Sequence, residues 1–241
     1  MDSSFWRTVT SAPALEPGYI HIWRCRLDQA AESLPQLESI LGTDELARAS
    51  RYHFPIHKNR YIAGRAELRK ILGGYLRTPP SAISFVYSEF GRPELLPALN
   101  SAGITFNVSH SEDLWILAVS LTPVLGIDVE RIRIDFGGED IARSNFAANE
   151  FQELMSLPER ERPQAFFDCW TRKEAYVKAL GAGLQIPLDS FEVTLRPDDA
   201  PRFLRVPGDE WNLLSFSPED GYQASVAYRG AKAGTRFLQL R

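Results

Sequence analysis

Residues 124–130 read Val-Leu-Gly-Ile-Asp-Val-Glu, and the interpretation of the whole chain starts from this stretch. Branched apolar residues alternate with small or acidic ones, which is the pattern of a β-strand whose two faces meet different surroundings. The apolar side chains would share one face, and the other face would carry Gly126, Asp128 and Glu130. We therefore predict a buried strand with two carboxylates on one side.

Two neighbouring carboxylates on an otherwise apolar strand are costly, because their charges repel each other and each loses solvation. A divalent hard cation would relieve both problems, since Mg²⁺ is typically held by one or two carboxylates together with substrate phosphates. Gly126 on the same face would leave room for a ligand. The alternative is a structural role, in which Asp128 pairs with an arginine and Glu130 is solvated at the strand end.

Outward from this strand, the same order of patterns is found on both sides. Upstream, we predict a strand at 19–27 and two helical stretches, at 43–53 and 56–76, that Pro55 separates. Three strands follow, at 83–87, 104–108 and 114–120. Thr43 is the expected N-cap of the first helical stretch, with two acids behind it. Downstream, we predict a helix-rich stretch at 141–180, interrupted near Pro158 and Pro163. Three short strands follow it, at 191–195, 211–216 and 222–228.

This order gives one plan used twice, with strand, helices and strands in each half. Runs of strands and runs of helices in this arrangement indicate an α+β fold. The joint falls near Thr122-Pro123, so we predict an N-terminal half at 1–122 and a C-terminal half at 123–241.

Residues 166–178 read Phe-Phe-Asp-Cys-Trp-Thr-Arg-Lys-Glu-Ala-Tyr-Val-Lys and predict a helix. In a helix, Trp170, Glu174 and Lys178 would form one stripe, because they are spaced four residues apart. A solvated Glu-to-Lys pair is the ordinary explanation of such spacing. Trp170 argues mildly against it, since it places an aromatic ring on the same stripe.

The motif at 106–111, which overlaps the strand predicted at 104–108, reads Phe-Asn-Val-Ser-His-Ser. Its last residues, Ser109, His110 and Ser111, could offer hydroxyl, imidazole and backbone N–H groups to a phosphate. The alternative is local turn chemistry, with a serine hydroxyl as a cap. The chain contains no nucleophile elbow, Walker A loop or Gly-x-Gly-x-x-Gly fingerprint, so the common hydrolase and nucleotide-binding motifs are excluded.

Positive charge gathers between Thr43 and Arg77, where eight basic residues stand against three acids. A local excess of five positive charges in a chain of net charge −4 indicates an anionic ligand or partner for this stretch. For any single arginine, however, a solvated helix face is the simpler explanation.

Length and composition limit the class of protein and the kinds of partner. The chain has 241 residues, enough for one large domain or two of roughly 120 residues. Its 44% hydrophobic and 24% charged residues are typical of a globular protein, and the net charge of −4 speaks against a general nucleic-acid or anionic-membrane binder. The two cysteines form no disulfide framework, and neither a secretory signal nor a transmembrane run is visible. We therefore expect a cytoplasmic protein with no nucleic-acid or membrane partner.

In order and spacing, four segments together resemble the Sfp-type 4′-phosphopantetheinyl transferases. They are Gly-Arg-Pro-Glu-Leu at 91–95, Phe-Asn-Val-Ser-His-Ser at 106–111, Gly-Ile-Asp-Val-Glu at 126–130 and Trp-Thr-Arg-Lys-Glu-Ala-Tyr-Val-Lys at 170–178. The similarity spans about residues 43 to 195 and begins with a basic helical region, 48–69. Four ordered motifs are far more specific than any one of them.

The resemblance implies a fold and a reaction. The fold would be a monomeric pseudo-dimer of two similar α+β halves, with coenzyme A in the cleft between them. The reaction would transfer 4′-phosphopantetheine from coenzyme A to a serine hydroxyl of an apo acyl or peptidyl carrier protein, releasing 3′,5′-ADP. Such carriers serve fatty acid, polyketide or nonribosomal peptide synthesis.

The resemblance also implies roles at the metal site. Asp128, Glu130 and Glu174 would hold Mg²⁺, which also contacts the coenzyme A pyrophosphate. Glu174, directly or through a bound water, would take the proton of the carrier serine. Lys178 would stabilise the pyrophosphate oxygens and assist the leaving 3′,5′-ADP. Trp170 would pack beneath the metal site.

The remaining implied contacts are with coenzyme A itself. Arginines suit the 3′-phosphate, because a guanidinium matches its oxygen geometry in a bidentate way. The implied coenzyme A contacts are Arg48, Arg51, Arg60, Arg92, Ser109, His110, Lys173 and Lys178. Arg92 stands where the family commonly has a lysine; it keeps the positive charge but not the point-like ammonium.

Two other classes of function stay open on the sequence. A catalytically silent module that binds coenzyme A or carrier protein would share the fold, since a fold does not fix a function. The complete set of acidic and basic residues argues against it, because a silent relative could lose any of them. A Mg²⁺-dependent phosphodiesterase would release 3′,5′-ADP without a carrier protein.

Overall fold

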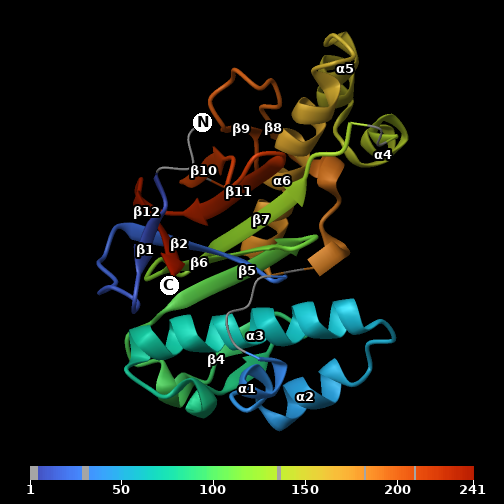
Figure 1. The fold of residues 1–241 in the computed structure, drawn as a ribbon. Coiled ribbons are helices and arrows are strands. Elements are labelled where there is room, and N and C mark those ends of the chain that lie inside the picture. The colour runs from blue at the N-terminus through green and yellow to red at the C-terminus, as the bar shows by residue number, and fades with distance from the viewer. Residues whose placement is uncertain (1–4, 29–32, 135–136, 182, 209) are drawn as a thin grey trace.

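The computed structural model describes residues 5–28, 33–134, 137–181, 183–208 and 210–241, and it is a mixed α+β structure (Figure 1). The helices are α1 Leu34–Glu38, α2 Thr43–Ala49, α3 Pro55–Leu76, α4 Gly138–Asn145, α5 Ala148–Ser156 and α6 Arg162–Leu180. The strands are β1 Arg7–Val9, β2 Tyr19–Arg26, β3 Phe85–Tyr87, β4 Pro93–Leu95, β5 Thr105–Ser111, β6 Leu114–Ser120, β7 Leu125–Arg131, β8 Glu192–Val193, β9 Phe203–Arg205, β10 Trp211–Phe216, β11 Tyr222–Arg229 and β12 Gly234–Leu240. The predicted α+β class is confirmed.

The larger strands form two sheets. One has the order β1-β12-β2-β6-β5, and the other has the order β10-β11-β7. In the first sheet β2 pairs with β6 and β6 with β5, each antiparallel, and in the second β7 pairs with β11 and β11 with β10, again antiparallel. Two short hairpins, β3–β4 and β8–β9, lie apart from these sheets. The predicted boundary at 122/123 falls in the connection between β6 and β7.

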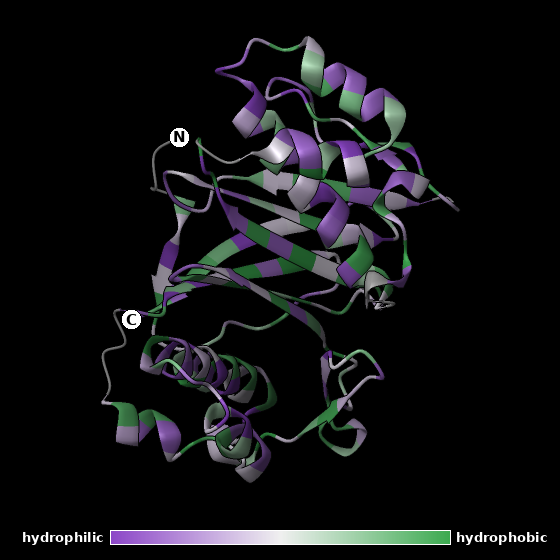
Figure 2. Ribbon diagram, turned by 90° about the vertical axis from the view of Figure 1, so that its right-hand side faces the viewer, coloured by the Kyte–Doolittle hydropathy of each residue, from purple (hydrophilic) through white to green (hydrophobic). Residues whose placement is uncertain are grey.

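The two sheets are packed between two layers of helices (Figure 2). Helix α3, with α1 and α2 packed against it, covers the outer face of the first sheet. Helix α6 covers the outer face of the second sheet, and α4 and α5 pack against α6. A third apolar core lies between the sheets and contains Ile20 and Ile22 of β2, Ile127 and Val129 of β7, and Val226 of β11. The carboxylate-bearing strand β7 is therefore buried on one face by the other sheet and on the other face by α6.

Strand β6 shows why several predicted strands lacked a simple alternation of apolar and polar residues. All seven of its residues are buried. Leu114 and Ile116 join the core between the sheets, whereas Trp115 and Leu117 join the core beneath α3. A strand covered on both faces reads as a continuous apolar run.

The predicted helical stretches are found, but several boundaries differ. Helix α2 ends at Ala49, short of the predicted residue 53, and the stretch predicted at 141–180 begins at Gly138 and has a further break at 146–147. Gly42, not Thr43, is the N-cap of α2, and its N–H donates to the Glu45 carboxylate at 2.8 Å. Pro55 opens α3, as its fixed φ angle and missing N–H allow at a first helical position. Pro163 likewise lies in the first turn of α6, so it begins this helix and does not interrupt one. Within the described residues, no helix has the length and apolarity needed to cross a membrane.

The last strand, β12, was not predicted. It runs parallel to both of its neighbours and lies between β1 and β2. The sheet of the N-terminal half is therefore completed by residues from the C-terminal end of the chain.

Candidate active site

The carboxylate-bearing face of β7 is turned toward α6, as the alternation predicts. At Gly126 the two backbones come so close that an added Cβ would lie 2.1 Å from the Ala175 carbonyl oxygen and 2.3 Å from the Ala179 nitrogen. The expectation that Gly126 leaves room for a ligand is wrong, because α6 itself fills this space. The glycine instead lets α6 approach β7 closely, which brings the side chains of α6 next to Asp128 and Glu130.

We expect Gly126→Ala to lower the free energy of unfolding by about 3 kcal/mol or more, because rigid backbone atoms block the new methyl group. For a chain of this size the melting temperature should fall by roughly 6–12 °C. Gly137→Ala is the matched control, since an added Cβ there meets no atom of the described residues within 4 Å, and it should stay within about 1 kcal/mol of wild type. Thermal unfolding of both variants checks this, and equal melting temperatures would contradict it.

Asp128 is the most buried carboxylate of the site, with 3% of the residue exposed. Its Oδ1 accepts hydrogen bonds from the Lys178 Nζ at 2.5 Å and from the Ser109 hydroxyl at 2.9 Å, and Lys178 also donates to Ser109 at 2.8 Å. The partner of Asp128 is therefore a lysine of α6, not the arginine of the structural alternative. Its Oδ2 is buried and receives no hydrogen bond from the residues that the structure describes.

Glu130 and Glu174 complete a group of three acidic residues. Glu130 is half-buried and accepts a hydrogen bond from the Ser111 hydroxyl at 2.7 Å, so it is not simply solvated at the strand end. Burial, and then the charge of Asp128, raise the pKa of Glu130 above its ordinary value. The pKa of Glu174 is raised by the same two causes in the same order, while Lys178 opposes the rise.

Burial is the larger cause of both pKa shifts, and the negative charge of Asp128 is the second. As they stand, no three His, Cys, Asp or Glu side chains among the described residues are arranged to hold a metal ion. The chemistry of the donors nevertheless fits one. Asp128 Oδ2 is a buried carboxylate oxygen without a hydrogen bond, Glu130 and Glu174 lie within its electrostatic reach, and oxygen ligands of this kind are what Mg²⁺ prefers.

Trp170, the third member of the predicted stripe, belongs to an aromatic cluster. Its ring stacks on Phe166, with centroids 5.8 Å apart and planes 18° from parallel, and it also contacts Phe146. The ring is partly exposed and packs among residues of the core beneath α6. This placement agrees with a packing role.

Lys173 is not brought to the site, although it directly precedes Glu174. Its side chain is fully buried and forms an ion pair with Glu150 at 2.7 Å. It also donates to the carbonyl oxygens of Leu188 and Phe191 at 2.7 and 2.6 Å. All three donors of the ammonium are used in the core, so the expected contact of Lys173 with coenzyme A finds no support in its position.

Arg92 is likewise occupied inside the protein. Its guanidinium donates to three backbone carbonyls, those of Lys178 in α6, Phe106 in β5 and Leu125 in β7, at 2.9, 3.2 and 3.2 Å. Burial lowers the pKa of this guanidinium. Arg92 thus connects β5 of the N-terminal half with β7 and α6 of the C-terminal half. Its position favours a structural role over the expected contact with coenzyme A.

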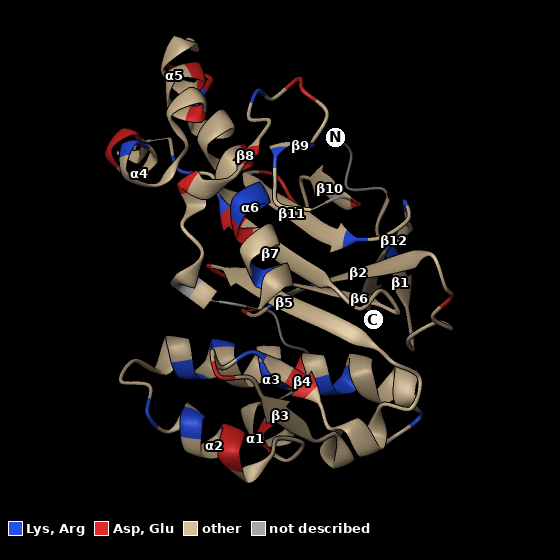
Figure 3. Cartoon of the chain, turned by 180° about the vertical axis from the view of Figure 1, so that it is seen from behind, with Lys and Arg blue, Asp and Glu red and all other residues tan. Residues whose placement is uncertain are grey.

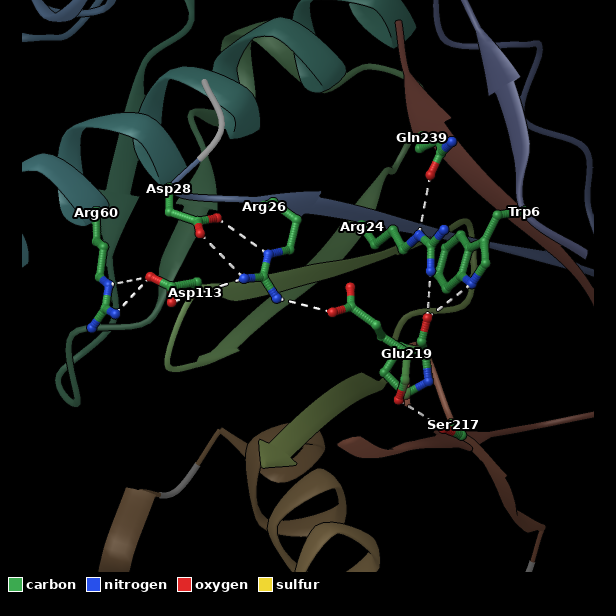
Figure 4. Close-up of polar contacts among 10 residues, drawn as sticks. Trp6, Arg24, Arg26, Asp28, Arg60, Asp113, Ser217, Glu219 and Gln239 are labelled. Carbon is green, nitrogen blue, oxygen red and sulfur yellow. Dashed lines mark hydrogen bonds and ion pairs between the residues drawn. The ribbon is translucent and has the colours of Figure 1, made fainter. Parts of the chain in front are cut away.

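Several basic side chains between Thr43 and Arg77 are bound to carboxylates within the fold, so fewer are available to an anionic ligand than the charge count indicated. Arg65 and Arg69 are buried and share the carboxylate of Glu45. Arg60 binds Asp113 in the β5–β6 turn at 2.6 Å, and Figure 4 shows it pointing to Asp113, which lies next to Arg26. Figure 3 shows Lys and Arg residues distributed along α2 and α3, but several of these charges are balanced within the fold.

Arg48 and Arg51 remain at the surface and line a pocket of about 510 Å³. Tyr52, Tyr61 and Tyr87 form much of its wall, and the Arg48 guanidinium lies 5.5 Å from the ring centroid of Tyr61. Aromatic rings together with guanidinium groups suit a ligand that has both a planar base and a phosphate. The remaining predicted contact, His110, is exposed at the end of β5.

Proteins of similar sequence establish the family. The chain is 41% identical over 211 residues to the 4′-phosphopantetheinyl transferase HetI of Nostoc sp., and the match covers 88% of each chain. The chain belongs to the 4′-phosphopantetheinyl transferase superfamily. The family models agree, since "4′-phosphopantetheinyl transferase, N-terminal" matches residues 27–122 and "4′-phosphopantetheinyl transferase superfamily" matches residues 124–227.

Two further relatives of the transferase are more distant. It is 33% identical over 205 residues to the 4′-phosphopantetheinyl transferase psf-1 of Bacillus pumilus, a match that covers 83% of this chain and 84% of the relative. It is 29% identical over 161 residues to the 4′-phosphopantetheinyl transferase Sfp of Bacillus subtilis, covering 66% and 69%. The predicted family and the prediction of an enzyme are confirmed.

The structure of the transferase also shows contacts around the site and in the neighbouring core that the sequence did not reveal. Ser111 and Asn107 lay within a quoted motif, but nothing indicated that they face β7 across a sheet boundary. Glu150 is the buried partner of Lys173, and it lies 23 residues away on another helix. The alternation along β5 could have predicted that Asn107, Ser109 and Ser111 share one face. It could not have predicted which residues of β7 they contact.

Proposed function

We propose that this transferase moves 4′-phosphopantetheine from coenzyme A to a serine hydroxyl of an apo acyl or peptidyl carrier protein and releases 3′,5′-ADP. The observation that carries the proposal is the group formed by Asp128, Glu130, Glu174 and Lys178, which places three carboxylates and one ammonium on facing sides of β7 and α6. Relatives named as 4′-phosphopantetheinyl transferases support the same reaction.

Asp128, Glu130 and Glu174 would hold Mg²⁺ in this reaction. When bound, the ion supplies a positive charge that orients the pyrophosphate and stabilises the charge developing on it. Asp128 contributes the buried Oδ2, which has no hydrogen-bond donor among the described residues. Ser109 and Lys178 hold its other oxygen and so orient the carboxylate.

Glu174 is the proposed general base for the carrier serine. It is half-buried, and its pKa is raised toward neutral pH relative to that of an exposed glutamate, which makes it a stronger base. Lys178, with 30% of its side chain exposed, would stabilise the pyrophosphate oxygens and the leaving 3′,5′-ADP. Both residues project from the same helix, one turn apart.

The pocket at Arg48 and Arg51 is the proposed site of the 3′-phosphoadenosine part of coenzyme A. The two guanidinium groups would bind the 3′-phosphate, and His110 would contact phosphate nearer to the acidic group. Arg60 is the weakest of the arginines proposed for this phosphate, because Asp113 already accepts from its Nε and its Nη2.

We also propose that the two halves are a pseudo-dimer within a monomeric chain. Both halves contain a strand, a long helix, a short hairpin and two more strands, and the sheet orders β2-β6-β5 and β7-β11-β10 correspond one to one. The separate matches at 27–122 and 124–227 support a division at the same point.

Intact-mass measurement of an apo carrier protein, incubated with the transferase, coenzyme A and Mg²⁺, tests the proposal. We expect a mass gain of one phosphopantetheine arm per carrier, and we expect the gain to disappear when Mg²⁺ is chelated. Coenzyme A binding without any gain across a panel of carriers would contradict the proposal in favour of a silent binding module. Release of 3′,5′-ADP in the absence of carrier would instead indicate a phosphodiesterase.

A further inference from the structure

The two sheets meet where β5 lies beside β7, and side chains of β5 make the connection. The two strands belong to different sheets and run in the same direction. Asn107, Ser109 and Ser111 are alternate residues of β5 and lie on one face of it. Each of them forms a hydrogen bond to β7, so residues of the N-terminal half contact the strand that carries the acidic group in the C-terminal half.

The hydrogen bonds of Ser111 can be assigned without ambiguity. A serine hydroxyl has one proton to donate and two lone pairs to accept with. The Arg131 backbone N–H can only donate, so at 3.1 Å it uses a lone pair of the Ser111 Oγ. The single Ser111 proton is therefore directed to Glu130 Oε2 at 2.7 Å.

This arrangement fixes one oxygen of Glu130 and leaves the other available. The Ser111 Oγ is held by the main chain of β7, so it offers its proton from a defined position. Glu130 Oε1 receives no hydrogen bond from the part of the chain that the structure describes. A carboxylate held in this way loses rotational freedom before a ligand arrives, and partners of this kind orient metal-binding side chains in proteins.

We propose that Ser111 is a positioning residue for Glu130, through which the N-terminal half sets the orientation of a metal-binding carboxylate in the C-terminal half. The inference rests on the proposed function, because it assumes that Glu130 binds Mg²⁺. It predicts that removing the Ser111 hydroxyl weakens Mg²⁺ binding specifically, beyond any general loosening of the two strands.

Asn107 provides the matched control. It lies on the same face of β5 and also bridges to β7, where its Oδ1 accepts from the Ile127 N–H at 2.8 Å. Among the described residues, Asn107 has no hydrogen bond to a carboxylate of the site. Asn107→Ala therefore weakens the contact between the strands without touching Glu130, whereas Ser111→Ala affects both, and Ser111→Thr keeps the hydroxyl.

The experiment is calorimetric titration of Mg²⁺ into each protein saturated with coenzyme A, with thermal unfolding measured alongside. We expect Ser111→Ala to weaken Mg²⁺ binding by about 10- to 100-fold, as loss of such outer partners does. In carrier modification, the Mg²⁺ concentration for half-maximal rate should rise correspondingly. Ser111→Thr should restore binding, and Asn107→Ala should lower the melting temperature while leaving Mg²⁺ affinity unchanged.

Two results would overturn the inference while leaving the transferase function intact. One is Ser111→Ala that binds Mg²⁺ as the wild type does. The other is Asn107→Ala that weakens Mg²⁺ binding as much as Ser111→Ala, because the contact would then act only by holding the strands together. A wild-type protein that neither binds Mg²⁺ nor modifies a carrier would overturn the proposed function, and this role of Ser111 with it.

Discussion

Asp128→Asn is expected to lower kcat/KM for carrier modification by about a thousandfold or more while the protein stays folded. Asparagine keeps the shape of the side chain but removes the negative charge that Lys178 and Ser109 surround. A bound metal ion contributes several kcal/mol of charge stabilisation, and each 1.4 kcal/mol corresponds to a factor of ten in rate. Losing one ligand charge at the buried centre of the site should remove much of this contribution.

Stability and activity can be separated for this variant. Asp128 is buried, so loss of its ion pair with Lys178 is partly offset by the smaller desolvation cost of a neutral amide. Glu153→Gln is a suitable control, because this carboxylate pairs with Arg196 on the surface, outside the acidic group. A folded Asp128→Asn protein that retains more than about a tenth of wild-type kcat/KM would contradict the metal assignment.

Lys173→Met is expected to destabilise the protein strongly, by about 3–5 kcal/mol. Its loss leaves the buried Glu150 carboxylate without a counter-charge and two buried carbonyl oxygens without a donor. Glu150 also accepts the N–H groups of Ala147 and Val193, so the disturbance reaches the start of α5 and the strand β8. A fall in melting temperature of roughly 10 °C is expected, and thermal unfolding measures it.

Lys178→Met is the same substitution on the same helix and should have the opposite profile. Lys178 is partly exposed, and its donors face the acidic group. We expect kcat to fall by about a hundredfold or more, as on removal of a charge-stabilising donor, with a much smaller change in melting temperature. If Lys173→Met kept wild-type stability but lost activity, the assignment of Lys173 to the core would be wrong and a direct contact with coenzyme A would be restored.

Much of the fold followed from local patterns. The strands at 114–120 and 211–216 have the predicted boundaries, and Pro55 separates α2 from α3 as expected. These elements are long, strongly patterned or bounded by proline. Strands β1 and β9 are three residues long and mostly exposed, so they carry no pattern that local sequence reasoning can detect.

The candidate site was predictable in its acidic residues but not in its cations. Asp128, Glu130 and Glu174 stood out because carboxylates are rare on buried strands and in aromatic helices. Lys173 and Lys178 look alike in the sequence, and only the packing of α6 against its neighbours decides that one ammonium is buried and the other reaches the site. Carbonyl oxygens hold Arg92 and Asp113 holds Arg60, and local sequence patterns could not reveal these partners because they come from distant segments.

The position of β12 has a consequence for the order of folding during synthesis. This strand pairs on both sides, with β1 and with β2, so the first sheet cannot be completed until residues 234–240 have left the ribosome. Until then β1 lacks the strand with which it pairs, and β2 has an open edge where a foreign strand can add. Long-range parallel pairing of this kind forms slowly, because the ends of a long loop must first meet. A fragment ending at residue 122 would keep this open edge permanently, so the half of the chain that supplies Ser111 depends on the other half to complete its sheet.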